Sequence, residues 1–191
     1  QGPLATALRA VALNVQGRPL EGTDSVPETF SARDFHHMLR WFGPLRGVDT
    51  VRAMESMLRK QWFHGRISRS EANRRLTAVL ATTGATFLIR LSDSEPGSYA
   101  FSCTTRSSQS SKHYLIHHSP ELGFSTPSGQ AIKSIDEVVF HFCREVDVMI
   151  PCPGSEFPAL LAQVDELTNR LGDDLAHRYT SFDDGADDLD F

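Results

Sequence analysis

An arginine inside a short apolar strand is the residue of this sequence best suited to binding an anion. Alternating apolar residues predict a β-strand over residues 86–92, with Arg90 and Ser92 on the face opposite to Ile89. A guanidinium in such a strand is costly to bury unless an anion meets it. The polar loop at 93–97 can turn backbone N–H groups toward an oxyanion. The pattern predicts a phosphate site, and an arginine paired with a structural carboxylate is the alternative.

Four ordered motifs surround this arginine. They are W-F-H-G-R-I-S-R-S-E at 62–71, A-T-F-L-I-R-L-S at 85–92, G-S-Y-A-F-S at 97–102 and K-H-Y at 112–114. In order and spacing they resemble the Src-homology-2 (SH2) family over residues 61–152, although Ala85 stands where that family usually has glycine. The resemblance implies an α+β fold with a central antiparallel β-sheet flanked by two α-helices. It also implies binding of tyrosine-phosphorylated peptides or proteins.

The resemblance assigns roles in a phosphotyrosine pocket residue by residue. Arg90 matches the arginine that clamps the phosphate, since a planar guanidinium can hold two phosphate oxygens at once. Arg69 matches the basic residue that covers the phosphate and the tyrosine ring. The other implied pocket residues supply hydroxyls, a histidine or backbone N–H groups, and they are Ser92, Ser94, Ser102, His113, Asp93 and Glu95. Leu115 stands where many members have lysine, which leaves Arg69 as the main cationic wall.

Ligand residues that follow the phosphotyrosine are expected to cross the central sheet near Tyr114 and Leu115. They would then reach the loops at 123–129 and 147–154. Tyr114 could equally be a core aromatic with a solvated hydroxyl.

The pocket residues need elements to position them. Ser68 and Glu71 have the spacing of a capping box and predict a helix through about Leu80. Strands are predicted near 86–92, 98–104 and 112–118. Ser134 and Glu137 form a second capping box before an apolar helical stripe, made by Ile135, Val138, Val139 and Phe142.

The flanking sequence divides into three parts. Residues 1–30 form an N-terminal extension in which Ala7–Val15 could be a strand or a short helix. Residues 31–60 form a helical linker, with one helix starting at Ser31 and a second from Asp49 to Lys60, that leads directly into residues 61–152 and should pack on them. Residues 153–191 combine a helix starting near Pro158 with a disordered acidic tail.

Tyr179 lies in the acidic tail and is a candidate phosphorylation site. Once phosphorylated it could dock in its own pocket or in that of a second copy, giving a closed monomer or a reciprocal dimer. The alternative is a solvated, unphosphorylated tail. The chain is expected to be monomeric unless Tyr179 is phosphorylated.

Composition limits the function classes. The net charge is −5, the segment from Leu171 onward contributes −6 of it, and the remainder is about +1, so no basic face for nucleic acid is expected. No apolar stretch approaches the ~20 residues of a membrane span, and the start lacks a signal-peptide pattern. Cys103, Cys143 and Cys152 lack C-x-x-C spacing and predict free thiols in a reducing compartment. We therefore expect a cytoplasmic protein without metal or cofactor, or a nuclear one if it resembles the STAT-type transcription factors.

The motifs favour a binding module over an enzyme. No P-loop, dinucleotide fingerprint, kinase catalytic loop or nucleophile elbow appears, and Met149 stands where a Cys143-based C-x5-R phosphatase loop needs arginine. The first hypothesis is an adaptor that recruits its parent protein to phosphorylated partners. The alternatives are a regulatory region of an SH2-containing kinase or a STAT-like factor, or a phosphate-independent scaffold. W-F-G-P at 41–44 is similar to amoebozoan SH2-containing kinases, and the run at 87–95 resembles STAT-type proteins.

Overall fold

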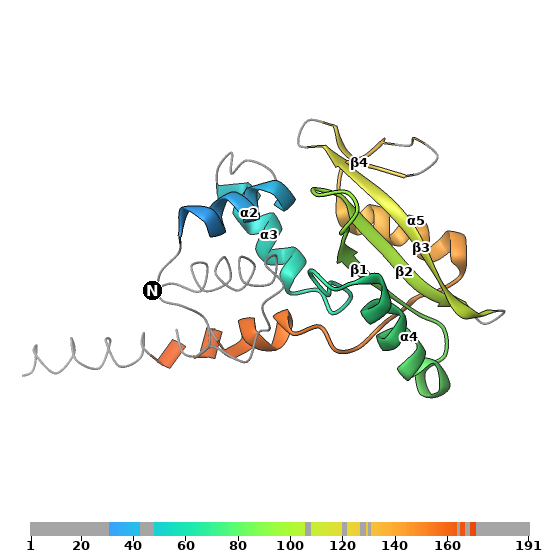
Figure 1. Cartoon of the computed structure of the whole chain (residues 1–191). Helices are drawn as coiled ribbons and strands as arrows, with labels where there is room; N and C mark the ends of the chain where they lie inside the picture. The colour runs from blue at the N-terminus through green and yellow to red at the C-terminus, as the bar shows by residue number, and fades with distance from the viewer. Residues whose placement is uncertain are drawn as a thin grey trace, which may run out of the picture.

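A mostly antiparallel β-sheet organises the chain (Figure 1). The computed structural model describes residues 31–42, 48–105, 108–119, 122–126, 129, 131–163, 165–166 and 169–170. These residues form six strands in the spatial order β5-β4-β3-β2-β1-β6. The strands are β1 Thr86–Leu91, β2 Tyr99–Thr105, β3 Ser108–Ser119, β4 Gly123–Ser125, β5 Ala131–Ile132 and β6 Ile150–Pro151.

The predicted strands agree with β1, β2 and β3, and the antiparallel pairing is confirmed from β1 through β5. β3 begins earlier than predicted, because its first residues pair back toward β2 at Thr105. β6 departs from the expected pattern, since Thr86 and Phe87 pair with it in parallel. β4, β5 and β6 have only two or three residues each, too few to carry a recognisable alternation.

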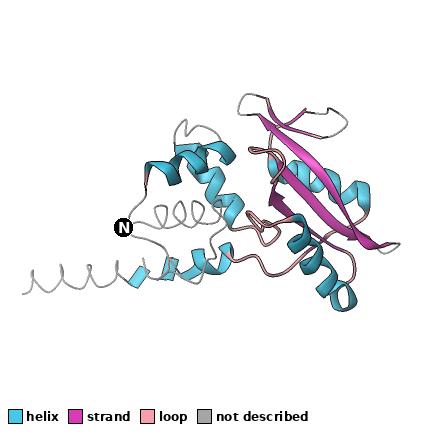
Figure 2. Cartoon of the chain, in the orientation of Figure 1, coloured by secondary structure: helices cyan, strands magenta, loops and turns pink. Residues whose placement is uncertain are grey.

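One helix covers each face of the sheet (Figure 2). Helix α4 (Arg69–Thr83) and helix α5 (Ile135–Val146) begin where the capping boxes predict. The Ser68 and Ser134 hydroxyls accept hydrogen bonds from the N–H groups three residues later, at 3.1 and 3.2 Å. Gly84 caps the C-terminal end of α4, and its φ of 78° favours glycine. Both predicted helices are confirmed.

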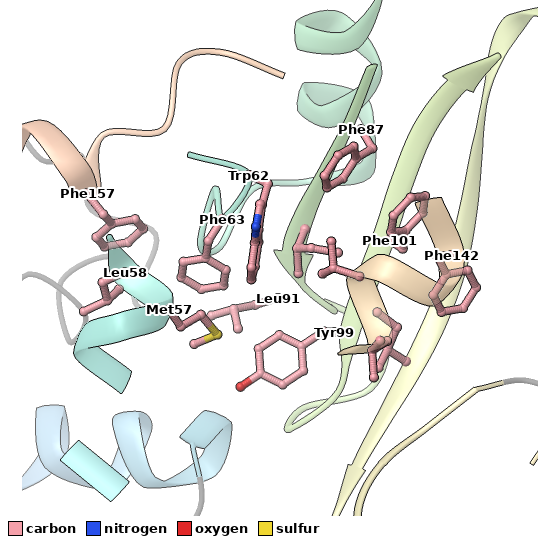
Figure 3. Close-up of a cluster of buried hydrophobic side chains, with 14 of the residues drawn as sticks. Met57, Leu58, Trp62, Phe63, Phe87, Leu91, Tyr99, Phe101, Phe142 and Phe157 are labelled. Carbon is pink, nitrogen blue, oxygen red and sulfur yellow. The ribbon is translucent and has the colours of Figure 1, made fainter. Parts of the chain in front are cut away.

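The two faces of β1 pack against different apolar clusters. Leu88 packs with Ala72 and Leu76 of α4 in a small cluster on the Arg90 face. Phe87, Ile89 and Leu91 belong to the larger core on the other face, together with the α5 stripe. The ring of Phe101 stacks on those of Phe87 and Phe142 at centroid distances of 5.3 and 5.1 Å. Figure 3 shows Phe101 between these two rings.

Helices α2 (Ala32–Phe42) and α3 (Val48–Leu58) share this larger core. Met38, Trp41, Met54 and Leu58 are buried in the same cluster as Phe63. The helices extend close to the predicted bounds, and they are not independent of the sheet. The domain boundaries at residues 30, 60 and 152 stay predictions.

The chain after α5 returns to β1 and then to α4. The Cys152 N–H donates to the Phe87 carbonyl at 2.7 Å, directly after the β6 pairing. Arg75 of α4 donates to the Gly154 carbonyl at 2.9 Å and also pairs with Glu71 at 2.7 Å. Residues 157–163 are helical, as the position of Pro158 indicates, and Phe157 stacks on Phe63 with 5.6 Å between ring centroids. This segment is therefore fastened to both β1 and α4.

The three cysteines are free, as predicted, and all three are buried. Burial raises the pKa of Cys103 to about 11 and that of Cys143 to about 12, so both thiols stay protonated near neutral pH. In the described part of the chain no helix could span a bilayer. Several predictions concern residues that the structure does not describe. They are the element at Ala7–Val15, the acidic tail from residue 173 with Tyr179, and the apolar positions Val164, Leu167 and Leu171 of the predicted last helix.

Phe142→Ala should lower the free energy of unfolding by about 3–5 kcal/mol, since the ring is 2% exposed and stacks on Phe101. Urea denaturation measures the change. Phe140→Ala is the matched control on the same helix, because Phe140 is 59% exposed, and it should change stability by less than about 1 kcal/mol. Equal losses in the two variants would show that the core is not where the structure puts it.

Candidate functional site

The guanidinium of Arg90 is buried in β1 with incomplete pairing. The residue is 7% exposed, and its Nη1 donates to the Leu91 carbonyl at 3.2 Å. Its nearest carboxylate oxygen is Asp93 Oδ2, 4.0 Å from Nη1. Within the described residues Arg90 Nε has no hydrogen-bond partner. A buried cation with so little compensation is a natural partner for an incoming anion.

The charge environment reinforces this description. Burial lowers the pKa of Arg90, Asp93 raises it, and Arg69 lowers it again. The alternative predicted from sequence, an arginine tightly paired with a structural carboxylate, fits poorly. The Asp93 side chain is 44% exposed, and 4.0 Å is too long for a hydrogen bond.

The loop after β1 closes around Ser92. Its backbone N–H donates to the Ser98 carbonyl at 2.9 Å, and the Ser98 N–H donates to the Glu95 carbonyl at 3.0 Å. The Ser92 hydroxyl lies 3.2 Å from the Ser94 hydroxyl and accepts from the Glu95 N–H at 3.3 Å. The Glu95 N–H, expected to face a phosphate, is thus engaged inside the loop. Its predicted role requires that this bond be exchanged.

Ser102 and His113 form the part of the site contributed by β2 and β3, where they are directly paired. His113 Nε2 donates to Asn73 Oδ1 at 2.8 Å, because an amide oxygen can only accept. His113 Nδ1 then accepts from the Ser102 hydroxyl at 2.9 Å. Burial, together with Arg69 and Arg90, lowers the pKa of His113 from 6.5 to about 4. The ring is therefore neutral and fixed in one tautomer.

Arg69 is the first residue of α4 and is exposed. It acts electrostatically on both Arg90 and His113, since it lowers the pKa of each. The structure thus brings together side chains from α4, β1 and β3 that are far apart in the sequence. Ser92 and Ser94 add hydroxyls from the loop after β1, and Ser102 adds one through its contact with His113.

Two residues of this region were missed by sequence reasoning. Asn73 follows Arg69 by four residues on α4, a spacing that places both on the same helix face and could have indicated it. Arg66 precedes α4, and its Nε lies 3.5 Å from Asp93 Oδ1. No motif singles out Arg66, because the contact depends on the loop conformation.

Tyr114 and Leu115 lie on opposite faces of β3. Tyr114 is half-buried, with its ring 5.5 Å from that of Phe142 and 6.3 Å from that of Phe101. Leu115 is half-buried on the His113 face. Tyr114 therefore packs at the border of the core, and the specificity role of both residues stays a prediction.

Comparison with models of protein families matches residues 62–142 to the SH2 domain. Among curated proteins, the chain is similar to two kinases of Dictyostelium discoideum. It is 34% identical to dual specificity protein kinase shkD over 124 residues, which are 62% of this chain and 16% of the kinase. It is 31% identical to dual specificity protein kinase shkA over 136 residues, 70% of this chain and 25% of the kinase.

Tyrosine-protein kinase SYK of Gallus gallus is 37% identical over 102 residues, 50% of this chain and 16% of that kinase. The chain thus spans a quarter or less of the length of these relatives. The resemblance to amoebozoan SH2-containing kinases is confirmed.

We expect His113 to stay neutral, with the proton on Nε2, until the pH falls to about 4. Long-range 1H–15N correlation spectra recorded against pH measure this directly. Because the folded-state pKa lies below the ordinary 6.5, the contribution of His113 to stability is complete above pH 6.5 and is lost as the pH falls toward 4. His113→Gln should therefore show a shallower loss of unfolding free energy over that range. A His113 ring that titrates near 6.5 would contradict the arrangement.

Proposed function

Because residues 62–142 form an SH2 domain, a phosphotyrosine-binding module, we propose that this chain binds tyrosine-phosphorylated peptides through Arg90 and its neighbours. In doing so it recruits its parent protein to phosphorylated signalling partners. The observation that carries the proposal is the buried Arg90 guanidinium, whose Nε has no partner among the described residues.

The charge of the ligand explains why phosphorylation would be read. A phosphotyrosine carries about −1.5 to −2 charges near neutral pH and three acceptor oxygens. Two of them can accept from the planar Arg90 fork, which a tyrosine hydroxyl cannot do. The phosphate would supply the counter-charge that the buried Arg90 guanidinium lacks. An unphosphorylated tyrosine would leave that cation desolvated and unpaired.

The side chains around Arg90 suit the remaining parts of the ligand's phosphotyrosine. Arg69 adds a second cation from α4, and its exposure leaves it able to lie over the ligand. The neutral His113 presents a ring without adding charge, in the position that the family resemblance assigns beneath the tyrosine ring. Ser92, Ser94 and Ser102 add hydroxyl donors around the phosphate position, and the Asp93 and Glu95 N–H groups are the proposed backbone donors.

The two Dictyostelium relatives favour a second proposal about the longer protein. Their alignments cover 124 and 136 residues, so the similarity extends beyond the family match at 62–142. In that proposal the chain is a regulatory region of an SH2-containing kinase and brings the kinase to phosphorylated substrates. Determining the adjoining coding sequence tests this, and an adjoining region without a kinase fold would rule it out.

Arg90→Ala should weaken binding of a phosphotyrosine peptide by roughly 100-fold to 10,000-fold, because breaking a buried ion pair costs about 3–5 kcal/mol. A phosphotyrosine-peptide library, titrated by fluorescence polarisation with the unphosphorylated peptides in parallel, measures it. Arg74→Ala is the control, since Arg74 lies on the solvent side of α4 with its side chain 71% exposed. Equal binding of both peptide forms would refute the proposed function.

Arg69→Ala should weaken the same interaction by about tenfold or more, since Leu115 supplies no second cation on that face. The comparison with Arg74→Ala removes the effect of losing one positive charge from the same helix. If the two variants bind the peptide equally well, Arg69 is not part of the pocket.

A further inference from the structure

The Asp93 carboxylate lies between two arginines. Its Oδ1 is 3.5 Å from Arg66 Nε, and its Oδ2 is 4.0 Å from Arg90 Nη1. Both distances exceed the usual 2.7–3.2 Å of an N–H···O hydrogen bond. The carboxylate is therefore shared between the two guanidinium groups and held tightly by neither.

The three side chains differ in their freedom to move. The Arg90 side chain is 8% exposed, whereas those of Asp93 and Arg66 are 44% and 41% exposed. Arg90 is fixed by a strand paired on both sides, and Asp93 follows β1 in a loop. A change of partner would thus move the carboxylate and leave Arg90 in place.

We propose, on the premise that the site binds phosphotyrosine, that the Asp93 side chain is a displaceable counter-anion of Arg90 and that Arg66 takes it over when a phosphate enters. A phosphate held by both terminal nitrogens of Arg90 would lie beside the Asp93 carboxylate, whose Oδ2 is 4.0 Å from Nη1. Two anions repel each other there, and the carboxylate moves fully to the arginine that it already contacts.

This exchange has a consequence for affinity. Every ligand anion must replace Asp93, so an anion that interacts weakly with Arg90 gains too little to stay bound. Asp93 thereby lowers the affinity for all anions, and Arg66 raises it without contacting the phosphate. The loop carboxylate and the residue before α4 act as positioning groups for Arg90, not as ligands of the phosphate.

Two simpler arrangements compete with this one. In the first, Asp93 stays beside Arg90 and merely repels the ligand. In the second, Arg66 leaves Asp93 and binds the phosphate itself. Comparing ligands of different charge tests whether Asp93 stays in place and repels the ligand. A double-mutant cycle of Asp93 and Arg66 tests whether Arg66 binds the phosphate itself.

The experiment uses the full chain with phenyl phosphate and phenyl sulfate, which share a tetrahedral anion but differ in charge. NMR titrations at about pH 7.5 keep the phosphate doubly ionised, since its second pKa is about 6. We expect Asp93→Asn to bind both compounds about tenfold more tightly, by the same factor for each. Glu145→Gln matches the change in net charge on an exposed residue of α5 and should leave both affinities unchanged within about twofold.

Arg66→Gln should weaken the binding of both compounds several-fold, and Arg74→Gln is its control. In the Asp93→Asn background, Arg66→Gln should have no further effect. Amide 1H–15N spectra of each variant establish that the fold is retained, as expected for exposed side chains.

The outcomes separate the hypotheses. An unchanged affinity in Asp93→Asn overturns the inference and leaves the proposed function standing, provided that phenyl phosphate binds. A gain much larger for phosphate than for sulfate means that the carboxylate stays in place, and overturns displacement. A loss from Arg66→Gln that persists without Asp93 shows direct phosphate contact and overturns the role given to Arg66. If phenyl phosphate binds to neither the unmodified chain nor Asp93→Asn, the proposed function itself fails.

Discussion

A cation held out of water without adequate counter-charge is the interaction on which this structure depends. Arg90 can remain in that state only because its surroundings prevent it from relaxing toward solvent. β1 pairs with β2 on one side and β6 on the other, and Leu88 is anchored under α4 on the same face. The packing energy of the sheet offsets the cost of desolvating the guanidinium. The site is thus stabilised by residues that take no part in its chemistry.

Because β1 has two different faces, one strand both contributes to the apolar core and positions Arg90. Ile89 and Leu91 contribute to a core that continues through Trp62 and Phe63 into α2 and α3. The intervening position, Arg90, faces α4 and the polar loop. Tyr99 links the two regions, because it pairs with Leu91 next to the loop and its hydroxyl reaches toward the Trp41 carbonyl at 3.5 Å. The helices before the domain are therefore in contact, through Tyr99, with the end of the strand that carries Arg90.

Much of this arrangement could be predicted from sequence, because local patterns determine it. Ser68 and Ser134 begin helices through a hydrogen bond three residues away, and β1 to β3 are long enough for alternation to show. The position of Arg90 within its strand follows from the same alternation. β4 to β6 exist only through pairing with distant residues, so no local pattern indicates them. The contacts of Asp93 with Arg66, and of His113 with Asn73, depend on how loops and helices meet in space. The Glu95 N–H was expected to be open, yet the hydroxyl of Ser92 engages it.

The parallel pairing of β6 bears on where this module can be cut. The family match stops at residue 142, inside α5. Beyond it, the Cys152 N–H still donates to β1, and the Gly154 carbonyl accepts a hydrogen bond from α4. Without that return, the Thr86–Phe87 end of β1 would lose its outer neighbour, whereas Ile89 and Leu91 would stay hydrogen-bonded to residues 62–65. The contacts that stabilise β1 therefore extend past the residues matched by the family model, and β6 supports the strand that carries Arg90.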